Sequence, residues 1–156
     1  MGRRWPNVLL AAGAAGIAIG AAFWILGPSD PAIALTPDDP AAVALGEQIY
    51  DAHCASCHGD QLEGQPNWRQ RGPDGRLPAP PHDAGGHTWH HPDVQLFRLT
   101  AVGPSGLTGG SYASDMPGFA GILTDGEIIA VLSYIKSTWP PEVRQRHDQI
   151  NAQAAP

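Results

Sequence analysis

Apolar residues recur every three or four positions in three stretches of the chain, which predicts three amphipathic helices. The first begins at Asp39-Pro40 and continues for about three turns. The second runs from Pro92-Asp93 to about Val102, and the third begins at Thr124 and ends before Pro140-Pro141. No stretch shows the regular alternation of a half-buried strand. The fold class is therefore all-α, with three or more helices.

Signals at the helix ends support these assignments. Asp39 is a typical N-cap residue and Pro40 suits the first helical position. Thr124-Asp125-Gly126-Glu127 has the form of a capping box. Gly46 lies on the apolar face of the first helix, where glycine lowers helix stability. It is either a tolerated glycine or a position where another element approaches closely.

The segment before the first helix has a different character. Val8 to Leu26 is a run of 19 residues without a charge, preceded by Arg3 and Arg4. This length and the arginines before it predict a transmembrane helix whose N-terminus stays in the cytoplasm. A cleavable signal peptide is the alternative, because Ala32-Ile33-Ala34 has the form of a cleavage site. Both interpretations place the rest of the chain in the periplasm.

The sequence thus divides into four parts. Residues 1–27 form a membrane anchor or an uncleaved signal, and residues 28–39 form a linker rich in proline and aspartate. Residues 40–140 are expected to form one folded domain, a common domain size. Residues 141–156 are expected to form a polar C-terminal tail.

The charge balance excludes one class of partner. The chain has 15 acidic and 9 basic residues, a formal net charge of −6. An acidic chain repels the phosphate backbone, so nucleic acid is not an expected partner. The acidity does not identify the true partner, because a local basic patch can exist on an acidic protein.

Both cysteines of the chain lie in Cys54-Ala55-Ser56-Cys57-His58. A disulfide across two residues would constrain very little chain, and a zinc site would need further ligands. A redox Cys-x-x-Cys pair would not require the histidine that follows. Cys-x-x-Cys-His is the signature of haem attachment, in which two thiols bond the porphyrin edge and the histidine reaches the iron. We therefore expect one covalent haem c on Cys54 and Cys57, with His58 as an axial ligand.

Met116 is the candidate for the other axial position. Apart from the initiator, it is the only methionine of the chain. Pro117 restricts it to an extended conformation, which suits a loop that projects the sulfur toward iron. Methionine is also a common core residue, but after a haem motif and before the last helix we expect it to ligate iron.

Four histidines between residues 82 and 91 offer an alternative: His82, His87, His90 and His91. Any of them could occupy the sixth position in place of the methionine, or bind an extra metal such as copper. No carboxylate or thiol is spaced to complete a separate metal site. This favours surface histidines, with one or two hydrogen-bonded at the haem edge.

Together these residues resemble the class I monohaem cytochromes c of bacteria. The resemblance extends over residues 40–139 and rests on three groups of residues: Gly46, Tyr50 and Cys54-x-x-Cys57-His58-Gly59; Met116-Pro117-x-Phe119; and the last helix with Tyr134. It implies that the first and last helices cross, with Gly46 allowing Tyr134 to approach. It also implies His58 and Met116 on opposite faces of the haem, with long loops around the ring.

In that family a proline carbonyl usually holds the proximal histidine. Pro78, Pro80 and Pro81 all compete for this role here. The resemblance implies an electron-transfer protein rather than an enzyme, with no small-molecule substrate. The expected partners are redox proteins of a respiratory or photosynthetic chain. Two alternatives remain, namely a fixed haem subunit of a larger oxidase or dehydrogenase, and a sensor or enzyme with an open sixth position.

The anchor assignment predicts how the chain behaves in membranes. Because Val8 to Leu26 is long enough to span a bilayer, mature protein should keep this segment and stay with the membrane after a carbonate wash. Mass spectrometry of the mature N-terminus checks the expectation. A chain beginning at Leu35 would show instead that Ala32-Ile33-Ala34 is a cleavage site.

Overall fold

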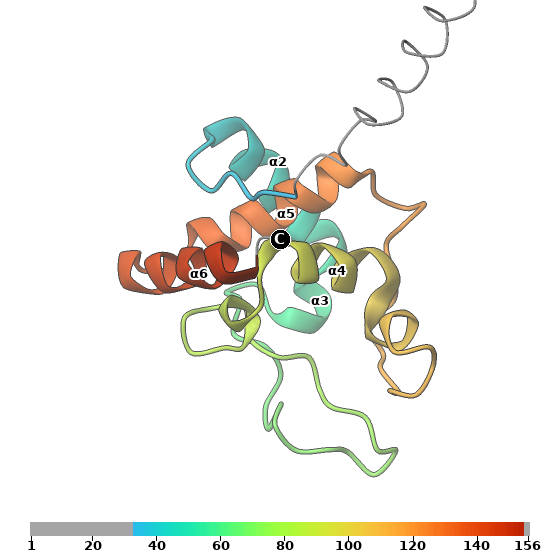
Figure 1. Ribbon diagram of the computed structural model, residues 1–156. Helices are drawn as coiled ribbons and strands as arrows, with labels where there is room; N and C mark the ends of the chain where they lie inside the picture. Colours follow the sequence, from blue (N-terminus) through green and yellow to red (C-terminus); the bar gives the residue numbers. More distant parts are fainter. Residues whose placement is uncertain (1–32, 155–156) are drawn as a thin grey trace, which may run out of the picture. The chain divides into compact units, whose positions relative to one another are not determined.

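A computed structural model describes residues 33–154. Within this range the chain forms five α-helices, one short 3-10 helix (Thr88–His90) and no β-strand (Figure 1). The α-helices are α2 (Pro40–His53), α3 (Ala55–His58), α4 (Asp93–Leu107), α5 (Asp125–Ser137) and α6 (Pro141–Ala154). The prediction of an all-α domain is confirmed.

The expected membrane helix at residues 8–26 lies outside the described residues. None of the helices between residues 33 and 154 is long and apolar enough to cross a bilayer.

The predicted start signals form the expected contacts. The Asp39 side chain accepts a hydrogen bond from the backbone N–H of Ala41, with Pro40 at the first helical position of α2. At the start of α5, the Thr124 and Glu127 side chains each accept the other residue's backbone N–H, which completes the capping box. These reciprocal bonds satisfy donors that a helix end otherwise leaves unpaired.

Helices α2 and α5 pack against each other and enclose the centre of the core (Figure 1). Gly46 of α2 meets the backbone of Ala130 and the side chain of Tyr134 in α5. A Cβ at Gly46 would overlap the Ala130 carbonyl oxygen and lie 2.7 Å from the Tyr134 Cβ. The glycine is therefore present because the two helix backbones touch at this point. The apolar stripe of α5 is buried beside it: Ile128, Val131, Leu132 and Ile135.

Helix α4 changes direction at Gly103. This residue has φ of 72°, which is outside the helical region, and Pro104 follows it. The chain then makes one more helical turn to Leu107, beyond the predicted helix end near Val102. A side chain at Gly103 would also meet the backbone of Met116 and Pro117, so the kink brings α4 close to the methionine loop.

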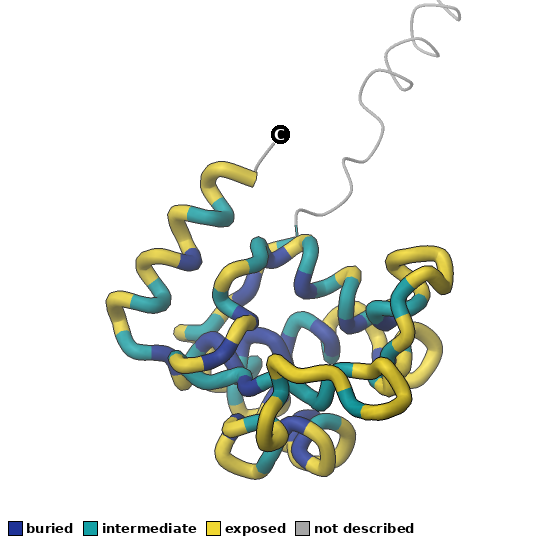
Figure 2. Tube along the Cα trace, turned by 90° about the horizontal axis from the view of Figure 1, so that it is seen from below, coloured by how far each residue is buried: buried dark blue, intermediate teal, exposed yellow. Residues whose placement is uncertain are grey.

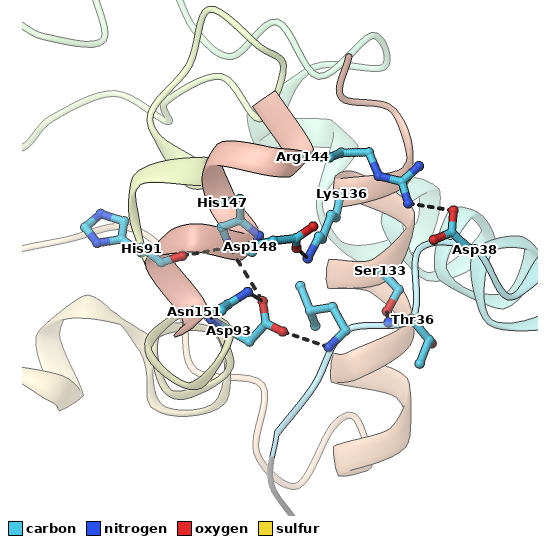
Figure 3. A network of polar contacts seen from close by, with 11 residues as sticks. Thr36, Asp38, His91, Asp93, Ser133, Lys136, Arg144, His147, Asp148 and Asn151 are labelled. Carbon is cyan, nitrogen blue, oxygen red and sulfur yellow. Dashed lines mark hydrogen bonds and ion pairs between the residues drawn. The ribbon is translucent and has the colours of Figure 1, made fainter. Parts of the chain in front are cut away.

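The expected polar tail is instead helix α6, which begins at Pro141. It docks through polar contacts (Figure 3): Lys136 of α5 pairs with Asp148 at 2.6 Å, and Asn151 exchanges two hydrogen bonds with Asp93 at the start of α4. His147 is fully buried and its Nε2 donates to the carbonyl of His91 at 2.9 Å. Burial and the nearby Lys136 lower the pKa of His147, so its neutral form is favoured.

The packed part of the chain also begins before Pro40. The Leu35 backbone N–H donates to Asp93 at 2.9 Å, and the Thr36 N–H donates to Ser133 (Figure 3). The folded unit therefore extends past both ends of the expected 40–140 range. Leu35 and Val143 also pack on the core, but helix α6 carries few apolar residues. Hydrophobic periodicity therefore does not reveal that these end segments dock.

Long connections join the helices, and most of their residues are exposed (Figure 2). The longest runs from Gly59 to His87 between α3 and the 3-10 helix. Two contacts link it to the methionine loop: Arg76 pairs with Asp115 at 3.0 Å, and the Arg71 guanidinium lies 5.4 Å from the centre of the Tyr112 ring. Exposed pairs of this kind contribute at most about 1 kcal/mol each.

The helix contact at Gly46 gives a stability prediction. Gly46→Ala should lower the free energy of unfolding by about 2 kcal/mol or more, because the new methyl group meets backbone atoms that cannot rotate away. Denaturant unfolding of the haem-loaded protein measures the change.

Gly126→Ala is the matched control. Gly126 also lies in a helix, but a Cβ there would meet nothing within 4 Å. This variant should keep the wild-type stability or gain up to about 1 kcal/mol from better helix propensity. Equal stabilities for the two variants would contradict the proposed backbone contact.

Candidate functional site

Cys54, Cys57 and His58 lie on one turn where α2 ends and α3 begins. Cys54 terminates α2, and its carbonyl accepts the backbone N–H groups of Cys57 and His58 at 3.1 and 2.9 Å. Both thiols are free; Cys54 is half-buried and Cys57 is exposed. His58 is buried, with 6% of its surface exposed. The turn therefore presents two thiols and one imidazole from five consecutive residues.

The state of the Cys54 thiol argues against a thiol redox site. Burial raises the pKa of Cys54 to about 11, and the nearby Cys57 adds to the effect. Redox-active Cys-x-x-Cys pairs have thiol pKa values below the ordinary one, because the thiolate is the nucleophile. The environment of Cys54 favours the neutral form instead.

The His58 imidazole is held by a single carbonyl. Its Nδ1 lies 2.8 Å from the backbone oxygen of Pro80. Since a carbonyl oxygen can only accept, the proton is on Nδ1 and the Nε2 lone pair is available for a metal. Of the three prolines that compete for this role in the sequence, Pro80 makes the contact. Burial lowers the pKa of His58, although this hydrogen bond acts in the opposite direction. The lowered pKa favours the neutral imidazole.

Tyr50 supports the segment that follows His58. Its side chain is fully buried, and its hydroxyl donates to the carbonyl of Gly59 at 2.9 Å. Burial raises the pKa of Tyr50 well above its usual value, so the hydroxyl remains a donor. The backbone N–H of Gly64 donates in turn to the carbonyl of His58 at 2.7 Å. The turn is thus fixed to α2 on one side and to the long connection on the other.

Met116 lies in the loop between α4 and α5 and packs, partly buried, against the core. Two backbone hydrogen bonds hold the loop on α4: Phe119 donates to Thr100 at 3.0 Å and Ala120 donates to Ala101 at 2.8 Å. The Met116 N–H donates to the Ser114 hydroxyl at 3.1 Å. The loop is therefore anchored to α4 three and four residues after the methionine.

The histidines of the 82–91 segment fall into two groups. His82 stacks face to face on His58, with ring centres 4.0 Å apart and planes inclined by 21°. The Nε2 atoms of His87 and His91 lie 3.0 Å apart, and His90 stacks on Trp89. Between residues 33 and 154 there is no group of three or more His, Cys, Asp or Glu side chains that could hold a metal ion.

The stacking of His82 bears on the sixth iron ligand. Two histidines that bind one iron from opposite sides direct their nitrogens at each other and do not stack. Hydrogen bonds with Leu62, Thr88 and Trp139 also hold His82. No motif in the sequence indicated these contacts. Burial and the neighbouring His58 lower the pKa of His82 well below its usual value, so the neutral form is favoured in both rings of the stack.

A protein-family model described as cytochrome c matches residues 43–139 of the chain. The chain belongs to the cytochrome c family. It therefore carries covalently bound haem c and takes part in haem-based electron transfer, and Cys54 and Cys57 fit the attachment site.

Comparison with solved structures finds cytochrome cL from the marine methylotrophic bacterium Methylophaga aminisulfidivorans. This cytochrome is 19% identical, with a TM-score of 0.47, and the match covers 84% of this chain and 86% of that chain. Comparison with curated protein sequences finds no match.

The residues of this cytochrome fit a covalent haem. Both thiols of the motif are free, and the surroundings of Cys54 favour its neutral thiol. His58 can offer Nε2 as a ligand, because its Nδ1 is already hydrogen-bonded to Pro80. An imidazole oriented by a carbonyl in this way is the usual arrangement of a metal-binding histidine.

Attachment through both thiols gives a direct prediction. Acid-acetone should fail to extract the haem, and replacing both Cys54 and Cys57 by alanine should abolish the haem-staining band on a denaturing gel. Ser56→Ala is the matched control, because Ser56 lies within the same turn and its hydroxyl makes only a 3.9 Å contact with the Cys57 sulfur. Haem that washes out of the wild type would contradict covalent attachment.

Proposed function

We propose that this cytochrome is a one-electron carrier with His58 and Met116 as its axial ligands. The observation that carries the proposal is the His58 Nδ1 to Pro80 carbonyl hydrogen bond of 2.8 Å, within the turn that also holds both thiols. It leaves Nε2 as the free coordinating atom of a buried, neutral imidazole.

Three features support Met116 as the second ligand. It is the only methionine in the described part of the chain, and its loop is held on α4 by backbone hydrogen bonds on its C-terminal side. Pro117 favours an extended conformation at Met116. The most deeply placed competitor, His82, stacks on His58 and so lies beside that ligand rather than opposite it.

Each of these residues has a separate role. Haem, when bound, would supply an iron that exchanges one electron. Cys54 and Cys57 would hold the ring, and His58 would offer its Nε2 to the iron from a turn that Tyr50 supports through Gly59. The Pro80 carbonyl raises the electron density of the imidazole through Nδ1–H. A thioether from Met116 favours the ferrous state and a high potential.

The proposed setting is the periplasmic face of the inner membrane. The apolar run at residues 8–26 would act as an anchor, residues 28–39 as a linker and the helical domain as the electron carrier. The partners would be redox proteins of a respiratory or photosynthetic chain. An anchor would keep the domain near membrane-bound partners and raise its effective concentration.

Met116→Ala tests the proposed ligand set. A thioether bound to low-spin ferric haem gives a weak absorption band at the red end of the visible spectrum. This band should be present in the wild type and absent in the variant, because no other methionine of the domain can replace the sulfur. The reduction potential should fall, and carbon monoxide should bind the ferrous protein rapidly. Met116→His should restore a low-spin spectrum at low potential.

Ile122→Ala is the matched control for this experiment. Ile122 lies in the same loop with 62% of its surface exposed, so the truncation should leave the band and the potential unchanged. Rapid carbon monoxide binding by the wild type, unaffected by Met116→Ala, would replace the electron-carrier assignment by a sensor or enzyme with an open site.

A further inference from the structure

The ring of His58 has a neighbour that its hydrogen bond to Pro80 does not explain. His82 lies flat against it, with 4.0 Å between ring centres and 21° between planes. The two rings come from different segments, since His58 ends α3 and His82 lies near the end of the long connection. The contact is therefore a tertiary one, made only when the 59–87 connection folds back onto the haem-binding turn.

A hydrogen bond alone leaves the plane of His58 underdetermined. The contact with Pro80 fixes the position of Nδ1, but the ring can still rock about the line from Nδ1 to the carbonyl oxygen. The final side-chain torsion of histidine is broad and has no sharp preferred value. A flat surface pressed against one face of the ring removes this remaining freedom.

His82 is itself held at three points. Its backbone N–H donates to the carbonyl of Leu62 at 2.7 Å, and its carbonyl accepts the indole N–H of Trp139 at 2.7 Å. Its Nδ1 lies 2.6 Å from the hydroxyl of Thr88. Leu62 adopts a φ of 66°, a costly conformation for a side chain of this size, and its carbonyl is the one that His82 uses. The ring that faces His58 is thus anchored through both its backbone and its side chain.

We infer that His82 is a positioning residue that sets the plane of the His58 imidazole over the haem. This inference rests on the proposal that His58 is an iron ligand. The orientation of an axial imidazole selects which iron d orbital mixes with it, and so it determines how unpaired spin is distributed around the ring. The plane is therefore visible in the spectra of the ferric protein, independently of any electron-transfer rate.

Three variants of the haem-loaded protein test the role of the flat face. His82→Ala removes the ring, His82→Phe keeps a flat ring without the Thr88 contact, and Thr88→Val keeps the imidazole but removes its side-chain anchor. The readouts are the g values of ferric low-spin haem and the chemical shifts of the haem methyl groups. His82→Ala should shift and broaden both sets most. Thr88→Val and His82→Phe each keep a flat ring without its side-chain anchor, so both should shift the signals less than His82→Ala does.

His90→Ala is the matched control. His90 is an exposed histidine of the same segment that stacks on Trp89, so its removal should leave both spectra unchanged. Wild-type spectra in His82→Ala would overturn the inference, and so would equal shifts in His82→Phe and His82→Ala. If His82→Ala yields no haem-loaded protein, Thr88→Val decides, because wild-type spectra there would overturn the inference.

The same spectra separate this inference from the assignment of His58. The ring protons of an axial histidine are strongly shifted in the ferric protein and can be assigned to one residue by isotope labelling. Shifted protons that belong to another histidine would contradict the proposed ligand set. Shifted protons that belong to His58, together with wild-type spectra in His82→Ala, would overturn only the role of His82.

Discussion

Helices α2 and α5 touch through their backbones at Gly46, and the position of the haem-binding turn depends on this contact. The turn begins where α2 ends, so any displacement of α2 moves Cys54 and His58 with it. Tyr50, which is buried one helical turn after Gly46, carries the same constraint to Gly59 through its hydroxyl. The packing of α2 on α5 therefore determines where the haem-binding residues of this cytochrome lie.

The 59–87 connection, which forms the other part of the site around His58, is held in a different way. The 59–87 connection has no regular secondary structure and few apolar residues to bury, so it is positioned by single hydrogen bonds to backbone groups. Around His58, the Pro80 carbonyl accepts from the His58 Nδ1–H, and the Leu62 carbonyl accepts from the backbone N–H of His82. The 59–87 connection is therefore sensitive to single substitutions, because no broad apolar surface compensates for a lost hydrogen bond.

These two kinds of construction explain what the sequence could predict. Hydrophobic periodicity and capping residues located α2, α4 and α5, and the Cys-x-x-Cys-His spacing located the haem, because both patterns are local. The choice of Pro80 among three prolines could not be made, since it depends on how the connection folds back. The docking of α6 was missed for a related reason: His147 and Asn151 bind through polar groups in a helix that looks fully solvated.

The carboxylate of Asp93 joins the two ends of the described chain. One of its oxygens accepts the backbone N–H of Leu35 and the other accepts the side-chain amide of Asn151, so the first and last packed segments are one side chain apart (Figure 3). A domain whose ends meet can be circularly permuted without redesigning its core. A short linker from the end of α6 to Leu35, with new termini at the exposed Gly75 turn, would give the chain a different order around the same haem-binding turn.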